Sequence, residues 1–131
     1  LEIYERIGKL IVQWHVDELA VEKQFMALNA ASAFAVGEAR AVAIIAAALA
    51  GIPVFEYTPA EVKQAVTNYG RSSKQQIQEM VRLQFGLAQA PQPADAADAL
   101  AIAICHSAMR DLPIVGSRQS AVGSRRDPKR P

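Results

Sequence analysis

The chain has 131 residues, of which 51% are hydrophobic and 6% aromatic, and its formal net charge is +1. This length supports a core without disulfides or a structural metal, and the single cysteine, Cys105, excludes a disulfide-rich secreted scaffold. The longest uncharged stretch, residues 41–55, has 15 residues and is too short to cross a bilayer, and charges in the first twenty residues exclude a signal peptide. We therefore expect a cytoplasmic protein that does not contact a membrane.

Charge is distributed unevenly along the chain. Residues 116–131 contain five basic residues and one acidic residue, or +4, whereas residues 1–115 contain nine basic and twelve acidic residues, or −3. Lys and Arg make phosphate contacts, so a net-acidic core is not typical of a simple nucleic-acid binder. If the core meets DNA, some carboxylates must be neutralised, and divalent cations are the usual candidate. The composition of residues 116–131 predicts a disordered basic tail.

The first half of the chain alternates helices and strands. Apolar residues at spacings of three and four predict an amphipathic helix over residues 1–14. The apolar run 19–21, which ends at Glu22, predicts a strand buried on both faces. An Ala-rich helix is predicted over residues 29–50, and Gly51, which follows it, is expected to cap its C-terminus. Residues 52–57 predict a second short strand, with its proline near the start.

The second half is predicted to be helical. Thr58-Pro59-Ala60-Glu61 forms a capping box, which predicts a helix from there to about residues 68–70. The same capping logic at Ser73 predicts another helix, closed by Gly86. After a loop with two prolines, the last helix is predicted to begin near Asp95 and to stop before the next proline.

The order of these elements predicts an α/β fold with a parallel sheet covered by helices. A stable sheet usually needs at least three strands, and only two are predicted. The chain also begins inside a helical pattern, without Met. We therefore expect residues 1–115 to form a core that is incomplete at its N-terminal side, followed by the tail at residues 116–131.

Three carboxylates could carry chemistry. Glu22 ends an apolar strand, where ligands bind in open α/β sheets, although a salt bridge to Lys23 or Arg40 is an alternative explanation. Asp95 and Asp98 are three residues apart at a helix start, where the alternative is helix capping and a favourable interaction with the helix dipole. Carboxylates suit Mg²⁺, and two such ions can support phosphodiester hydrolysis. Spacing alone leaves both interpretations open.

Several motifs, in order and with similar gaps, resemble the RuvC-type Holliday-junction resolvases. The resemblance runs from about residue 1 to residue 109, and the ordered motifs together are far more specific than an isolated Asp-x-x-Asp. The matching segments are residues 21–26 (Val-Glu-Lys-Gln-Phe-Met), 39–40 (Ala-Arg), 53–57 (Pro-Val-Phe-Glu-Tyr), 62–64 (Val-Lys-Gln) and 94–103 (Ala-Asp-Ala-Ala-Asp-Ala-Leu-Ala-Ile-Ala).

The resemblance implies an RNase H-like fold with a mixed sheet flanked by helices. It also implies a homodimer that depends on Mg²⁺, two ions per complete site, and nicks opposing strands of a four-way DNA junction in recombination and repair. The bacterial RuvA-RuvB branch-migration complex is the implied partner. Glu22, Asp95 and Asp98 match the family's acidic catalytic and metal-binding positions. The family's first strand, which bears an Asp-x-Gly motif with a further aspartate, has no match before Glu22.

Four residues are candidate DNA contacts. Phe25 follows the first strand, where its ring could stack on an unpaired base or could instead pack under the loop. Lys63, Arg71 and Lys74 lie in or near the starts of consecutive helices and could face a phosphate backbone, or could form a solvated face. The two lysines match basic DNA-contacting positions implied by the resemblance.

The alternatives to a junction endonuclease are a binding module that cuts nothing, because its metal site is incomplete, and a related nuclease acting on another nucleic acid. Cys105 and His106 are neighbours on a helix and point in different directions, which makes a poor metal pair. His15 follows a helix end and is expected to be a surface or capping residue.

Overall fold

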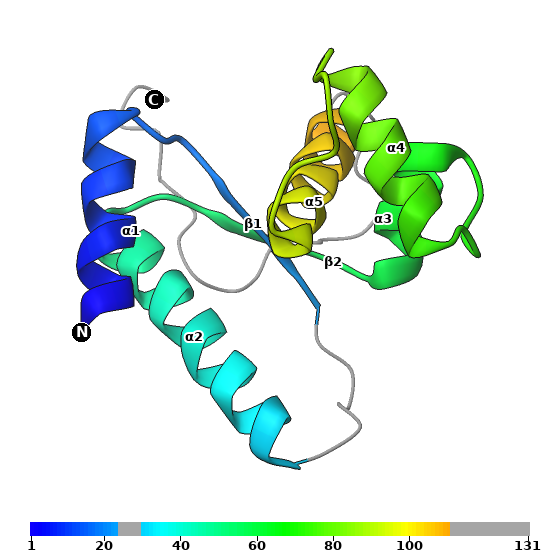
Figure 1. Ribbon diagram of the computed structural model, residues 1–131. Helices are drawn as coiled ribbons and strands as arrows, with labels where there is room; N and C mark the ends of the chain where they lie inside the picture. The colour runs from blue at the N-terminus through cyan, green and yellow to red at the C-terminus, as the bar shows by residue number, and fades with distance from the viewer. Residues whose placement is uncertain (24–29, 111–131) are drawn as a thin grey trace, which may run out of the picture. The chain divides into compact units, whose positions relative to one another are not determined.

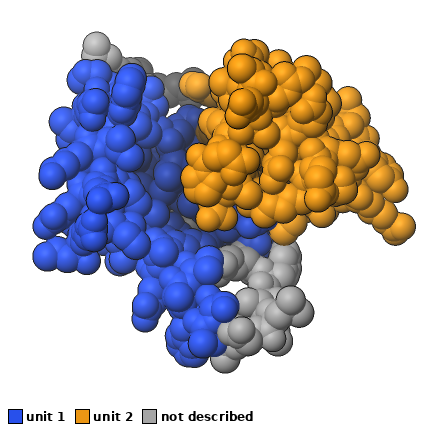
Figure 2. All heavy atoms as spheres, in the orientation of Figure 1, with its two compact units in different colours: residues 1–56, 117–131 blue, residues 57–116 orange. Residues whose placement is uncertain are grey.

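The computed structural model describes residues 1–23 and 30–110 (Figure 1). They divide into two compact units: residues 1–23 with 30–56 form unit 1, and residues 57–110 form unit 2 (Figure 2). The elements in chain order are α1 (Glu2–Gln13), β1 (Leu19–Glu22), α2 (Ala30–Leu49), β2 (Val54–Tyr57), α3 (Pro59–Thr67), α4 (Lys74–Gln84) and α5 (Ala94–Arg110).

Unit 1 is a β–α–β arrangement in which α2 connects two neighbouring parallel strands, and α1 packs against α2. The amide of Leu19 donates to the carbonyl of Pro53 over 2.9 Å, where the two strands begin to pair. The core consists of buried small and branched side chains with partly buried neighbours around them: Ala47, Ile52 and Val54, packed against Ile11, Val16, Leu19, Val21 and Ile44. The predicted parallel sheet is thus confirmed, and it has two strands in the described residues.

The end of α2 explains why β2 begins later than its sequence predicts. Gly51 has a φ of +71°, a left-handed conformation that glycine adopts without a steric penalty. The amide of Ile52 still donates to the carbonyl of Ala47, over 3.0 Å, and therefore belongs to the helix stop. Pro53 has no amide hydrogen to donate. The strand consequently starts at Val54, two residues after the predicted start.

Unit 2 consists of three helices that pack against one another in pairs. Buried residues recur four positions apart on each helix, which places them on one face. They are Val62 and Val66 on α3, Ile77 and Val81 on α4, and Ala97, Ala101 and Cys105 on α5. The small side chains of α5 allow the other two helices to approach it closely.

Both predicted capping boxes are present. The Thr58 hydroxyl accepts from the amide of Glu61 over 3.2 Å, and the Glu61 carboxylate accepts from the amide of Thr58 over 2.9 Å. Ser73 and Gln76 make the equivalent pair of bonds at the start of α4. Gly86 follows α4 with a φ of +64°, as expected of a residue that closes a helix. Within residues 1–23 and 30–110, no helix has the length and apolar character that crossing a bilayer requires.

Candidate nucleic-acid and metal site

Glu22 is the last residue of β1, and its side chain is exposed. Arg40 on α2 does not form the salt bridge to Glu22 that was the alternative interpretation of this carboxylate. Its Nε donates to the backbone carbonyl of Glu22 over 3.2 Å, and its terminal nitrogen binds Oε1 of Glu56 at 2.5 Å. No ion pair reaches the Glu22 carboxylate from any residue that the structure describes, Lys23 included.

The pair between Arg40 and Glu56 holds the carboxyl ends of both strands in place. The two side chains are only 26% and 27% exposed. Partial burial removes hydration from a charged group, so it is unfavourable without an opposite charge nearby, and Arg40 and Glu56 provide that charge for each other. Because the same guanidinium also binds the Glu22 carbonyl, Arg40 fixes the backbone that carries the Glu22 carboxylate. Sequence reasoning missed this role, although Arg40 is one of only two charged residues in a long Ala-rich helix.

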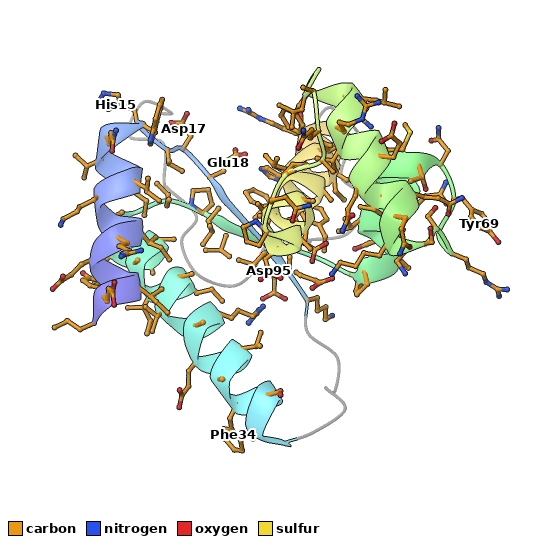
Figure 3. The ribbon with its side chains drawn as sticks, viewed as in Figure 1. His15, Asp17, Glu18, Phe34, Tyr69 and Asp95 are labelled. Atoms are coloured by element: carbon orange, nitrogen blue, oxygen red, sulfur yellow. The ribbon has the colours of Figure 1, made fainter. Side chains whose placement is uncertain are left out.

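Asp95 and Asp98 both lie near the start of α5, and Figure 3 labels Asp95 there. The helix begins at Ala94, so Asp95 lies within its first turn and is not the N-cap that the alternative interpretation proposed. Asp95 is exposed and forms no ion pair with the described residues. Asp98 is partly exposed, and its Oδ2 accepts from Nζ of Lys74 over 3.1 Å.

The structure thus brings together two predicted site residues that were assigned different roles. Lys74 was predicted to contact DNA and Asp98 to bind metal, yet they form an ion pair between the starts of α4 and α5. Lys63, on α3, is partly buried, and Arg71, between α3 and α4, is exposed. Neither has an acidic partner in the described part of the chain. Their charges are therefore available to a phosphate.

The donor set fits a hard divalent cation, because all three predicted ligands supply carboxylate oxygens. Glu22 belongs to unit 1, and Asp95 and Asp98 belong to unit 2. Over residues 1–23 and 30–110, no group of three or more His, Cys, Asp or Glu residues is arranged as a metal site. Phe25 and the predicted tail at residues 116–131 lie outside the described residues.

The neighbours Cys105 and His106 point in different directions, as predicted. The Cys105 side chain is buried, with its Sγ 3.7 Å from the carbonyl oxygen of Glu61. The His106 Nδ1 lies 2.6 Å from the hydroxyl of buried Tyr57. No local pattern could indicate this second contact, because the two residues are 49 positions apart. His15, with a φ of +49°, is exposed after α1, as expected.

One carboxylate in unit 2 is neutralised locally. The Glu79 carboxylate accepts from Nε of Arg82 over 2.9 Å and from its terminal nitrogen over 2.6 Å. This hydrogen bonding lowers the pKa of the Glu79 carboxyl and raises the pKa of the Arg82 guanidinium. Glu79 therefore stays ionised at neutral pH, and its charge is balanced within its own helix.

The β–α–β unit with a carboxylate at its strand end, and the helical unit with acidic helix starts, define an α/β protein of the RNase H-like class. The family model described as crossover junction endodeoxyribonuclease RuvC matches residues 1–106. The chain belongs to the RuvC family.

Curated relatives and solved structures agree with this membership. The chain is 52% identical over 109 residues to crossover junction endodeoxyribonuclease RuvC of Brevibacillus brevis, and 54% identical over 107 residues to that of Chloroflexus aggregans. These matches cover 83% and 82% of the chain and 66% and 65% of the relatives. The structure of Thermus thermophilus RuvC matches with a TM-score of 0.76 and 38% identity, over 83% of this chain and 66% of that one. The same protein in complex with a Holliday junction substrate matches with a TM-score of 0.75.

Proposed function

We propose that the protein acts as a structure-selective endonuclease that resolves four-way DNA junctions by metal-assisted phosphodiester hydrolysis. The observation that carries the proposal is the RuvC match over residues 1–106, which contains acidic residues at the strand end and the helix start. A solved neighbour was captured with a Holliday junction substrate. The chain spans 65–66% of the length of the curated relatives named above.

Glu22, Asp95 and Asp98 are the residues that would hold Mg²⁺, two ions in a complete site. When bound, the metal supplies an activated water and stabilises the leaving oxygen. Arg40 contributes by fixing the backbone at Glu22 through the 3.2 Å bond to its carbonyl. Asp95, exposed and without an ion-pair partner among the described residues, is available as a ligand as it stands. Asp98 becomes available when Lys74 turns toward a DNA phosphate, because the approaching phosphate competes for the ammonium.

Lys63 and Arg71 would hold the phosphate backbone through their unpaired charges. Phe25 would stack on a base at the junction centre. Paired nicks on opposing strands require two active sites, which a homodimer provides. The RuvA-RuvB branch-migration complex is the partner that we propose, and the bacterial cytoplasm is the proposed location.

The test is Mg²⁺-dependent nicking of a synthetic four-way junction. The protein used is a chimaera in which the part of a RuvC relative that precedes its matched region is joined before Leu1, since the match covers 66% of that relative. We expect junction nicking by the chimaera, with little nicking of linear duplex. Glu22→Gln and Asp98→Asn should each remove most of the activity while junction binding persists. Nicking at the parent rate by either variant would show that the carboxylate assignment is wrong.

A second candidate function is junction binding without turnover by the chain alone. The ion pair between Lys74 and Asp98 favours it, because an ammonium neutralises a carboxylate that catalysis would need for metal. This function predicts salt-dependent junction binding whose slope becomes shallower in Lys63→Ala or Lys74→Ala. An unchanged slope in both variants would remove these lysines from the interface.

A further inference from the structure

The connection between α3 and α4, residues 68–73, forms a corner that displays an exposed aromatic ring. Tyr69 is 57% exposed, and in Figure 3 its side chain extends away from the helices. The other tyrosine of unit 2, Tyr57, is only 3% exposed and uses its hydroxyl to contact His106. An exposed ring forgoes the free energy that its burial would provide, which makes Tyr69 a candidate ligand-binding residue.

The backbone that carries Tyr69 is held by hydrogen bonds on both sides. Asn68 ends α3 in the left-handed conformation, with a φ of +61°. The carbonyl of Tyr69 accepts from the hydroxyl of Ser72 over 2.6 Å and from its amide over 3.3 Å. The amide of Tyr69 donates to the hydroxyl oxygen of Thr67 over 3.2 Å. Ser72 is 3% exposed. The ring therefore projects from a fixed backbone, so stacking on it does not require the loop to become ordered.

An open pocket of about 440 Å³ lies beside the ring, a volume within the range of about 300–1,000 Å³ typical of small-ligand sites. Met80 adds an apolar surface to the lining, and Gln75 has an exposed amide that makes no hydrogen bond to any residue in the described ranges. An amide of this kind can donate to and accept from the polar edge of a base. The lining comes entirely from unit 2: Thr67, Tyr69, Ser72, Gln75, Gln76, Glu79 and Met80.

Charge around the pocket suits a nucleic-acid strand. The one carboxylate in the lining belongs to Glu79, and Arg82 binds both of its oxygens, so its repulsion of phosphate is offset. Arg71, two residues after Tyr69, is exposed and has no acidic partner in the described part of the chain. A guanidinium beside a stacking ring is the combination that single-strand binding sites use for backbone and base together.

We infer that the pocket at the α3–α4 corner binds an unpaired nucleobase of a nucleic-acid strand, which stacks on the Tyr69 ring. Gln75 contacts the base edge, and Arg71 binds the adjoining phosphate. The inference rests on the proposed function, because an unpaired base is available to this surface only if the protein engages nucleic acid. It adds a base-binding position on unit 2 to the proposed contact of Phe25.

The test measures binding of a short single-stranded DNA that contains 2-aminopurine, a base whose fluorescence is quenched by stacking. The full 131-residue chain is titrated against this strand, and anisotropy gives the affinity. Tyr69→Ala should weaken binding by about five- to 150-fold and abolish the protein-dependent quenching. Tyr69→Phe, which keeps the ring, should stay within about twofold and retain the quenching. Circular dichroism of each variant checks that the helices are intact.

Two control variants separate stacking from charge and from general surface effects. Arg71→Ala should lower the salt slope by about 0.7, the contribution of one single-strand phosphate, whereas Tyr69→Ala should leave the slope unchanged. Tyr4→Ala removes a partly exposed tyrosine from unit 1 and should change nothing.

Salt-dependent binding with equal affinity and equal quenching in the parent chain, Tyr69→Ala and Tyr69→Phe would overturn the base pocket while leaving the proposed function in place. Absence of binding to both the junction and the single strand would overturn both.

Discussion

Replacing Lys74 with glutamine tests whether Asp98 is a metal ligand, because the two side chains are joined across 3.1 Å. They are 56% and 45% exposed, so solvent and salt screen the pair. Exposed ion pairs of this kind contribute about 0.2–1 kcal/mol to stability. We therefore expect Lys74→Gln to lower the free energy of unfolding by less than about 1 kcal/mol. The fold should survive the change.

Metal affinity should respond more strongly than stability. Two unit charges 4 Å apart in water interact by about 1 kcal/mol, so a divalent cation near Asp98 would be repelled by the Lys74 ammonium by about twice that amount. Removing the ammonium should therefore tighten cation binding by up to about thirtyfold. The assay is titration of the N-terminally extended chimaera with Mn²⁺, which shares the oxygen-ligand preference of Mg²⁺, while electron paramagnetic resonance reports the free ion.

Two further variants decide whether the gain comes from Asp98. Lys63→Gln removes the same charge from a lysine with no acidic partner in the described residues, and its effect should be much smaller. Asp98→Asn added to Lys74→Gln should abolish the gain. Equal Mn²⁺ affinity in Lys74→Gln and the parent, or an equal gain in Lys63→Gln, would show that Asp98 does not bind the cation.

Three further predictions concern stability, and each rests on a single side-chain interaction. Arg40→Ala leaves a partly buried carboxylate unpaired, so urea unfolding should show a loss of about 1–3 kcal/mol, of which Arg40→Lys recovers only part. Thr58→Ala removes a capping box and should cost about 1 kcal/mol by the same assay, whereas Thr58→Ser should be nearly neutral. The Glu79 pKa is lowered by the hydrogen bond from Arg82, so its stabilising contribution is present above the ordinary carboxyl pKa and is lost as the pH falls through the lowered value. The melting-temperature difference between the parent and Glu79→Gln should accordingly be present at neutral pH and vanish in acid; a constant difference would contradict it.

Elements whose boundaries depend on nearby residues were predictable from sequence. A capping box satisfies its own helix start within three residues, so Thr58 and Ser73 placed α3 and α4 correctly. Gly51 and Gly86 marked helix ends because the residue that follows a helix often has a positive φ, which glycine adopts without a steric penalty. The error at the start of β2 has the same origin: the helix stop extends to Ile52 through a bond to Ala47, and the apolar pattern does not encode that bond.

Contacts between distant residues could not be predicted in the same way. Lys74 and Asp98 are 24 positions apart, and their pairing depends on how α4 packs against α5. Arg40 and Glu56 are 16 positions apart, and they meet because α2 crosses back to the second strand. The alternatives weighed for Glu22 included Arg40, but the pattern could not show that its guanidinium would take the backbone carbonyl and leave the carboxylate to solvent.

The ion pairs show which carboxylates contribute to the net charge of −3 in residues 1–115 without a basic partner, and this changes what that net charge implies about DNA binding. In the part of the chain that the structure describes, ion pairs engage Glu2, Glu56, Glu79 and Asp98. Glu22 and Asp95, two of the proposed metal ligands, are exposed and have no such pair there. A phosphate responds to the local potential more than to the net charge of a domain. The net charge of −3 is therefore compatible with DNA binding, because the carboxylate beside the Tyr69 pocket is neutralised by Arg82, and the unpaired carboxylates stand where cations are proposed to bind.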